Sequence, residues 1–264
     1  MNRIESKLKE LRKKKKKAFI AFITAGHPNL RVTEDLVLAF EKAGVDIIEL
    51  GVPFSDPLAD GTTIQASSET ALKKGITLEK ILETVQSIRR KSQLPIALMT
   101  YYKPIFHYGD ERFVKKAKAV GVDAVIIPDL PPEEGQNLIR LCRQSGLATV
   151  FFISPTTTRE RLKRIVQAST GFIYAVSIAG ITGARQQIPQ EIINQVRLAK
   201  RIGKKPVCVG FGISTAEQVK AFAKVSDGVI VGSAIVKEIE KNKGSKDCAA
   251  KVASFVRRLA EGLK

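Results

Sequence analysis

The feature that most constrains the fold is a repeated unit in which a helical pattern gives way to a continuous apolar run. Three copies read KAGVDIIELGVP (42–53), AVGVDAVIIPDLP (119–131) and KVSDGVIVGSA (224–234). In each copy a glycine and a polar residue turn the chain, and a loop rich in Pro, Asp, Gly or Ser follows the apolar run. Runs that are apolar at every position indicate strands covered on both faces, as in parallel sheets.

Apolar runs of this kind occur eight times, and amphipathic helical patterns separate them. The predicted strands span 18–24, 45–50, 95–100, 122–127, 148–153, 172–176, 206–209 and 228–231. The predicted helices span 33–43, 62–73, 78–91, 110–119, 132–145, 158–168, 190–202, 214–223, 233–241 and 246–262. Strands alternating with helices indicate βαβ units and a parallel sheet. Eight such units favour a closed (β/α)8 barrel, with an open doubly wound sheet as the alternative.

The length of the chain fits one such domain. A (β/α)8 barrel typically takes ~250 residues, and this chain has 264. We predict a single α/β TIM-barrel domain over 1–264, with extra loop helices and a basic N-terminal helix over 1–17. The lysine run before AFIAFITAG has the order of a signal peptide, but its apolar part is short. No apolar run approaches the ~20 residues of a membrane helix, so we expect a cytoplasmic protein with no membrane partner.

The net charge of +18 suggests a nucleic-acid partner at first sight. Residues 1–17 alone hold nine Lys/Arg against two Glu. The chain has no Trp and four Tyr, and it lacks helix-turn-helix, RNA-binding and zinc-finger patterns. We therefore favour a solvated basic surface that attracts anionic metabolites, and expect no nucleic-acid partner.

Soft metal ligands and nucleophiles are scarce. Three widely spaced cysteines fit no disulfide framework or CxxC site, and two histidines do not suffice for a histidine-rich metal centre. Lys103, in YYKP past the third predicted strand, is interpreted as a solvated loop lysine rather than a Schiff-base nucleophile. We expect no metal, and a chemistry that runs on carboxylates.

The catalytic residues of parallel barrels lie at the carboxyl ends of the strands. Glu49 stands in the apolar run DIIELG, where a carboxylate is costly to bury without a partner. Burial should raise its pKa, which suits a proton shuttle near neutral pH, although pairing with a lysine is an alternative. Asp56 and Asp60 follow in a loop with prolines and glycines, where turn formation or helix capping is a strong alternative to catalysis.

Glycine-rich segments after the last three strands predict a phosphate site: SIAGITGARQQIP (177–189), GFGIS (210–214) and GSA (232–234). Glycine lets backbone N–H groups approach an anion, and a helix beginning at Ser214 or Ser233 would add oriented donors. Plain strand-to-helix turns are the alternative. Apolar and aromatic residues at other strand ends could line a pocket, though each is individually more typical of a core: Phe22, Met99, Tyr101, Tyr174 and Phe211.

The acidic loop carries a family likeness. IELGVPFSDPLADG (48–61) resembles the signature of the tryptophan synthase alpha subunit family along its whole length. Similar segments cover nearly the entire chain: AFITAGHP, PIALMTYYKPIF (95–106), VIIPDLPPEE (125–134), SIAGITGAR (177–185), GFGIS and VGSAIVK (231–237). Unrelated phosphate-binding barrels share the glycine loops but not this acidic loop. Two departures are Thr62, where the family usually has proline, and Ile178, where some members have arginine.

The resemblance implies a lyase that cleaves indole-3-glycerol phosphate to indole and glyceraldehyde 3-phosphate by a retro-aldol reaction. It maps the family's catalytic carboxylates onto Glu49 and Asp60, and the threonine that meets the aspartate onto Thr182. Phosphate binding is implied for Gly183, Phe211, Gly212, Gly232 and Ser233. Enclosure of the indole is implied for Phe22, Met99, Tyr101, Ile126, Tyr174 and Phe211.

The resemblance also implies a partner. No cofactor is expected in this chain, whereas the beta subunit would use pyridoxal phosphate to join indole to serine in an α2β2 heterotetramer that makes L-tryptophan. Pro53, Asp56 and Pro104 are expected at the interface. One alternative is a catalytically weak barrel that mainly activates a beta subunit. Another is an indole-glycerol-phosphate synthase, which would need a catalytic lysine that none of the predicted strands contains.

Overall fold

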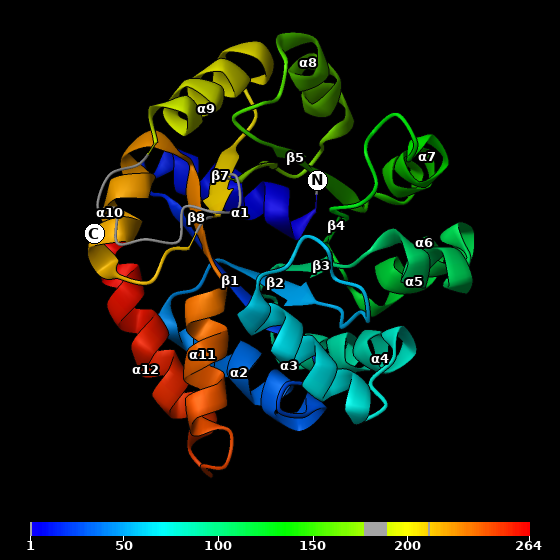
Figure 1. Ribbon diagram of the computed structural model, residues 1–264, viewed down its shortest axis with the longest axis vertical. Coiled ribbons are helices and arrows are strands. Elements are labelled where there is room, and N and C mark those ends of the chain that lie inside the picture. Colours follow the sequence, from blue (N-terminus) through cyan, green and yellow to red (C-terminus); the bar gives the residue numbers. More distant parts are fainter. Residues whose placement is uncertain (1, 177–188, 211) are drawn as a thin grey trace.

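Eight parallel strands close into a barrel in the computed structural model, which describes residues 2–176, 189–210 and 212–264 (Figure 1). The strands are β1 (Ala18–Thr24), β2 (Ile47–Gly51), β3 (Ile96–Met99), β4 (Ala124–Ile126), β5 (Ala148–Ile153), β6 (Ile173–Val176), β7 (Val207–Gly210) and β8 (Gly228–Val231). They pair in chain order, and β8 closes the barrel by pairing with β1. The predicted (β/α)8 class is therefore confirmed.

Helices surround the strands (Figure 1). Those after β1 are α2 (Leu30–Ala43), α3 (Thr62–Lys73), α4 (Leu78–Arg89), α5 (Tyr102–Tyr108), α6 (Asp110–Val120), α7 (Gln136–Ser145), α8 (Arg159–Ala168), α9 (Gln190–Gly203), α10 (Ala216–Val225), α11 (Ser233–Asn242) and α12 (Cys248–Ala260), with a final 3-10 turn (Glu261–Leu263). Within the described ranges, none of the helices has both the length and the apolar character that crossing a membrane requires.

One helix, α5, was not predicted. Pro104 stands in its first turn, where a missing N–H costs no intrahelical hydrogen bond. The first N–H of the helix, on Tyr102, donates to Asp129 Oδ1 at 2.9 Å, so the loop after β4 caps α5. Lys103 is exposed but belongs to this helix, which corrects its assignment to a loop.

Alternation along the strands sends one set of side chains into the barrel and the other toward the helices. Ile47 of β2 belongs to the interior cluster, whereas Ile48 and Leu50 belong to the outer cluster beneath the helices. Glu49 lies two residues beyond Ile47, so it points into the barrel. The local pattern of β2 thus places a carboxyl group inside an otherwise apolar interior.

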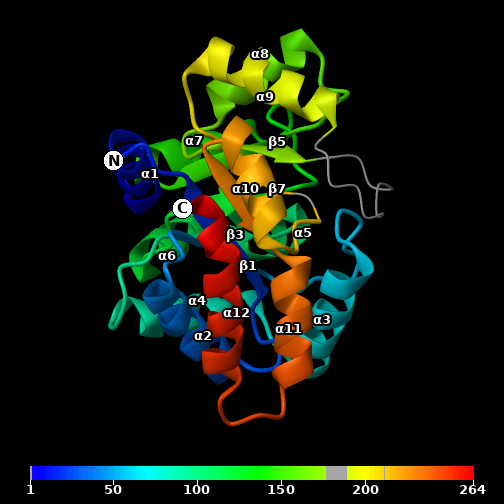
Figure 2. The ribbon, with the colours of Figure 1, turned by 90° about the vertical axis from the view of Figure 1, so that its left-hand side faces the viewer.

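The helix α1 (Arg3–Lys13) closes the amino-terminal end of the barrel. Its buried residues Ile4, Leu8 and Leu11 belong to the same interior cluster as the inward strand residues. In Figure 2, α1 lies on the left, and the loop that leads from β2 into α3 lies on the right. The apolar side of α1 therefore seals the end of the barrel away from that loop.

The predicted N-terminal helix over 1–17 is too long. Lys15 has φ +55°, its N–H donates to the Arg12 carbonyl at 3.1 Å, and the Lys16 N–H donates to the Leu11 carbonyl at 2.8 Å. This pair of bonds is a Schellman motif, which ends a helix by placing one residue in the left-handed conformation. The helix accordingly ends at Lys13, and the remaining lysines form the turn into β1.

Candidate active site

Glu49 lies inside the barrel on β2. Its neighbours in the strand register are Phe22 on β1 and Ala97 on β3, and only 1% of its surface is exposed. Neither of its carboxylate oxygens has a hydrogen-bond partner in the described part of the chain. The alternative of a lysine partner is therefore not realised there. A buried carboxyl group without a structural partner is costly, which favours a role toward a ligand.

The two acids of this site titrate differently. Burial and, secondarily, the charge of Asp60 raise the pKa of Glu49 from 4.5 to about 8. Burial also raises the pKa of Asp60 from 3.8 to about 6, although a hydrogen bond from Tyr101 opposes this rise. Near pH 7, Glu49 therefore holds a proton and Asp60 is mostly ionised. Such a pair can donate a proton to one atom of a ligand and stabilise positive charge on another.

Tyr101 holds the loop that carries Asp60. Its hydroxyl accepts the Ala59 N–H at 2.9 Å, and its ring stacks on Phe54 with the centroids 5.0 Å apart. The Asp60 N–H donates to the Pro57 carbonyl at 3.0 Å, which tightens the same turn. The sequence predicted Tyr101 only as an apolar contact. Its polar role was missed, although a buried tyrosine hydroxyl usually finds a partner.

Apolar side chains surround Glu49 within the barrel. Four of the predicted substrate contacts, Phe22, Met99, Ile126 and Tyr174, come from β1, β3, β4 and β6. Ile126 and Tyr174 belong to the interior cluster, and Met99 packs against it. Phe152 was not predicted, yet its ring lies 4.8 Å from that of Tyr174. Its position could have been predicted from the sequence, because Phe152 lies two residues after the inward-pointing Val150 on β5, and residues two apart on a strand point to the same face.

Two strand glycines let aromatic rings lie against the backbone. A Cβ atom on Gly51 would come 2.6 Å from the Phe22 ring, and one on Gly210 would come 2.5 Å from the Tyr174 hydroxyl. Both separations are too short for real atoms, so larger residues would displace the rings. Gly210, which the sequence suggested as part of a phosphate loop, thus has a packing role at the end of β7.

The helix after β8 offers hydrogen-bond donors to an anion. α11 begins at Ser233, directly after Gly232, and no side chain of the described residues caps its first turn. The first N–H bonded within this turn is that of Val236, which donates to the Gly232 carbonyl at 3.0 Å. The preceding N–H groups have no intrahelical acceptor, and the helix dipole adds to their attraction for an anion.

The helix after β7 differs from the prediction. α10 begins at Ala216 rather than Ser214, and Thr215 and Gln218 cap its first turn reciprocally. Its own side chains therefore already use donors that the sequence assigned to a phosphate. Gly212 has φ +50° in the turn that precedes the helix, a conformation that favours glycine. Three further predicted site residues, Thr182, Gly183 and Phe211, lie outside the described residues.

Two large apolar side chains stand out on the surface near the predicted interface. Leu58 is 95% exposed and Phe106 is 67% exposed. Leu58 lies two residues beyond the exposed Asp56, and Phe106 lies two residues beyond the half-buried Pro104. Pro53, by contrast, is buried within this chain. Exposed apolar side chains of this size near a predicted interface are consistent with a protein contact.

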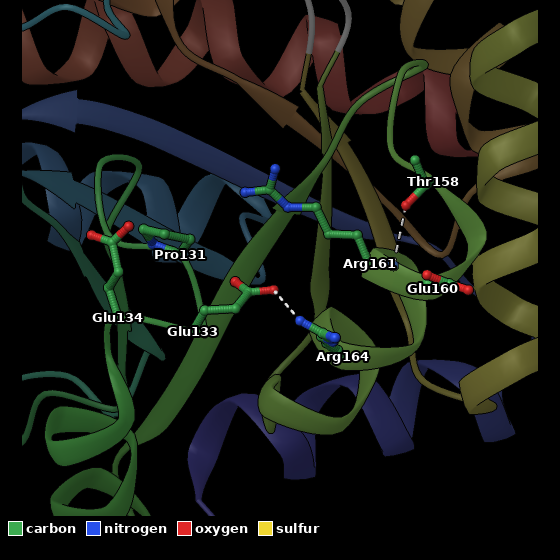
Figure 3. A pocket seen from close by; sticks show the side chains of 7 residues that line it. All are labelled: Pro131, Glu133, Glu134, Thr158, Glu160, Arg161 and Arg164. Carbon is green, nitrogen blue, oxygen red and sulfur yellow. Dashed lines mark hydrogen bonds and ion pairs between the residues drawn. The ribbon is translucent and has the colours of Figure 1, made fainter.

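A charged cavity of about 360 Å³ lies between the loop after β4 and the start of α8 (Figure 3). It is lined by Pro131, Glu133, Glu134, Thr158, Glu160, Arg161 and Arg164. Glu133 and Arg164 face one another across it at 3.7 Å, and both are partly exposed. Its walls are polar and do not include Glu49 or Asp60, so it is separate from the interior site.

Comparison with known proteins gives one consistent family. A family model described as tryptophan synthase alpha chain matches residues 8–264. The tryptophan synthase alpha chain of Geotalea daltonii is 50% identical over 263 residues, covering 100% of this chain and 99% of the relative. That of Thermoanaerobacter sp. is 46% identical over 263 residues, covering 100% of both chains.

Solved structures agree with these relatives. The crystal structure of tryptophan synthase subunit alpha from Legionella pneumophila is 36% identical, with a TM-score of 0.92, and covers 100% of this chain and 98% of that chain. A structure of tryptophan synthase from M. tuberculosis, in an open form with BRD0059 bound, is 31% identical with a TM-score of 0.89, covering 100% and 99%. The chain belongs to the tryptophan synthase alpha chain family.

Proposed function

We propose that this chain is a lyase that cleaves indole-3-glycerol phosphate to indole and glyceraldehyde 3-phosphate. The observation that carries the proposal is that Glu49 is buried in an apolar interior with no hydrogen-bond partner among the described residues, and that burial raises its pKa to about 8 and that of nearby Asp60 only to about 6. Family membership supplies the substrate, and the pair supplies the two protonation states that a retro-aldol cleavage needs. We expect no cofactor in this chain.

The reaction needs protons at two atoms of the substrate. Protonated Glu49 gives its proton to ring carbon C3 of the indole, and ionised Asp60 stabilises the ring N–H as positive charge develops. The resulting Glu49 carboxylate takes the proton of the hydroxyl on the adjacent glycerol carbon. The oxygen's electron pair forms the aldehyde carbonyl, and the electrons of the broken carbon–carbon bond return to the ring. Glu49 ends protonated, ready for another turnover.

The remaining contacts orient the substrate. The N–H groups at Gly232 and Ser233, which have no intrahelical acceptor in α11, suit the phosphate group, and we propose that Gly183, Phe211 and Gly212 complete that site. The indole would lie among Phe22, Met99, Tyr101, Ile126, Tyr174 and Phe211. Phe152 extends the same wall through its contact with Tyr174. Thr182 would meet Asp60 as the site closes.

The beta subunit would bind at the surface marked by Asp56, Leu58, Pro104 and Phe106. We propose an α2β2 heterotetramer in the cytoplasm, in which a pyridoxal-phosphate-dependent beta subunit converts the indole and serine to L-tryptophan. The alternative is a weakly catalytic barrel whose main role is to activate that subunit. Exposed Leu58 and Phe106 favour a partner under either interpretation.

One assay tests the proposal and separates the alternative. Indole release from indole-3-glycerol phosphate is measured with the purified chain, alone and with a beta subunit. Serine turnover by the beta subunit is measured with wild type and with Glu49→Gln. We expect cleavage that the beta subunit accelerates, and equal activation of serine turnover by both variants. Activation without any detectable cleavage by wild type would instead establish the alternative.

Tyr101→Phe should move the acidic limb of the cleavage profile to higher pH. The hydrogen bond from Tyr101 lowers the pKa of Asp60, so its removal leaves burial to raise that pKa further. The profile of kcat/KM against pH is compared with wild type on the same substrate. Tyr102→Phe is the matched control, because that hydroxyl bonds Asp110 instead. An unmoved acidic limb in Tyr101→Phe would contradict this role.

Leu58→Ser and Phe106→Ser should each weaken beta-subunit binding by roughly tenfold or more, since burial of a large apolar side chain contributes about 1.5–3 kcal/mol. Affinity is measured by titration calorimetry with the purified beta subunit. The unfolding midpoint should stay unchanged, because both side chains are already exposed in this chain. Unaltered affinity in both variants would place the interface elsewhere.

A further inference from the structure

A second cavity lies at the amino-terminal end of the barrel, away from Glu49. It has a volume of about 390 Å³ and is lined by Leu8, Leu11, Arg12, Lys15, Lys16, Lys17, Lys200, Lys204, Lys205, Pro206 and Asp227. These residues come from α1 and the turn after it, from the end of α9 and its link to β7, and from the residue before β8. The cavity therefore forms where three distant segments converge.

The cavity carries a large excess of positive charge. Seven Lys/Arg side chains line it against one carboxylate, Asp227. That carboxylate is already engaged by Lys200 at 3.0 Å and by Lys17 at 4.0 Å. The other five cations form no ion pair with a carboxylate in the described ranges: Arg12, Lys15, Lys16, Lys204 and Lys205. Lys205 donates instead to the Ser169 carbonyl.

Two of these lysines have a left-handed backbone conformation, which lysine disfavours. Lys15 (φ +55°) and Lys204 (φ +51°) are the only non-glycine residues with positive φ in the described chain. At the corresponding ends of α2, α6 and α7, the left-handed position is filled by Gly44, Gly121 and Gly146. Glycine adopts this conformation without strain, whereas lysine does not. Both exceptions put a cation at the same cavity.

Helix dipoles explain only part of this arrangement. The ends of α1 and α9 both lie at the cavity, and cations are favourable near helix C-termini. Each terminus carries only about half a negative charge, so protein groups offset little of the lysine and arginine charge, and Arg12, Lys15, Lys16 and Lys204 are exposed to solvent. Lys205 is partly buried, and burial, together with the charge of Arg143 outside the cavity lining, lowers its pKa. An anion in the cavity would supply the counter-charge that the protein does not provide there.

We propose that this cavity binds a small anion that carries two or more phosphate groups. The cations surround one concave site rather than spreading along a face, which suits a compact ligand better than a nucleic-acid strand. Leu8, Leu11 and Pro206 give the cavity an apolar side that an organic group attached to the phosphates could contact. The site is separate from the lyase site and does not depend on it.

Titration calorimetry with the full-length protein tests the proposal. Inorganic triphosphate and ATP, both without Mg²⁺, are titrated at low and at physiological salt. We expect one bound anion per chain, with affinity that falls as salt rises because the contacts are ionic. If ATP binds more tightly than triphosphate, the apolar side of the cavity contributes to affinity. If the two bind equally, the phosphate groups alone account for binding.

Two variants locate the site. Lys15→Gly/Lys204→Gly removes two cations while keeping the left-handed backbone, so affinity should fall by about tenfold or more. Its thermal midpoint should equal or exceed that of wild type, since glycine relieves strain. Lys42→Gln/Lys224→Gln removes the same charge from exposed positions outside the cavity and should bind like wild type.

Three results would overturn the proposal. The first is no binding of either anion by wild type at physiological salt. The second is equal weakening by both double variants, which would show a general effect of net charge. The third is tighter binding of a single-stranded RNA oligonucleotide than of triphosphate, which would make the surface a nucleic-acid site.

Discussion

Glu49→Gln is expected to lower the turnover of indole-3-glycerol phosphate cleavage by roughly 10³-fold or more, because proton transfer by a positioned acid or base contributes 10²–10⁴-fold. Glutamine keeps the size of the side chain but can neither give nor take the proton. Glu49 has no protein hydrogen-bond partner among the described residues, so the change breaks no such contact. The loss should therefore fall on turnover, with little change in KM.

The matched control is Glu83→Gln, which removes an exposed carboxyl group of α4. It should cleave the substrate at the wild-type rate. Circular dichroism and the unfolding midpoint establish that Glu49→Gln remains folded. Near-normal turnover in folded Glu49→Gln would remove Glu49 from the chemistry and leave Asp60 as the sole candidate acid.

The same variant should be more stable than wild type in alkaline solution. The pKa of Glu49 is about 8 in the folded chain against 4.5 ordinarily, so folding favours the protonated form. The contribution of protonated Glu49 to the free energy of unfolding is fully present below pH 4.5 and is lost as pH rises through 8. Between pH 5 and pH 8, wild type should lose on the order of 3 kcal/mol of unfolding free energy through this group, a loss that Glu49→Gln does not suffer.

Urea unfolding at pH 5 and pH 8 measures this difference. The unfolding free energy of Glu49→Gln relative to wild type should rise between the two pH values, and that of Glu83→Gln should not. Asp60 is present in all three proteins, so its own titration largely cancels. Parallel behaviour of wild type and Glu49→Gln would mean that Glu49 is not held protonated by burial.

The barrel could be predicted from the sequence because its main signal is local. Strands buried on both faces are apolar at every position, and the glycine turns before them repeat along the chain. The same regularity made Glu49 conspicuous, since a carboxyl group interrupts one of those runs. Its burial and raised pKa follow from the run itself, so the structure agrees with both predictions.

Features that depend on contacts between distant segments could not be predicted in this way. The link between Tyr101 and the Asp60 loop joins the segment after β3 to the loop after β2, and no pattern near Tyr101 in the sequence indicates it. Capping of α5 by Asp129 is of the same kind. The basic run near the N-terminus likewise gains a neighbour only when the end of α9 folds against it.

The most direct test of Glu49 as the proton shuttle is the pH profile of kcat/KM for indole-3-glycerol phosphate cleavage by wild type. Such a profile reports the ionisable groups of the free enzyme and substrate. We expect a bell with an alkaline limb near pH 8, where Glu49 loses its proton, and an acidic limb near pH 6 from Asp60. A rate that stays constant from pH 7 to pH 10 would contradict the assignment, because a deprotonated Glu49 cannot protonate the indole carbon.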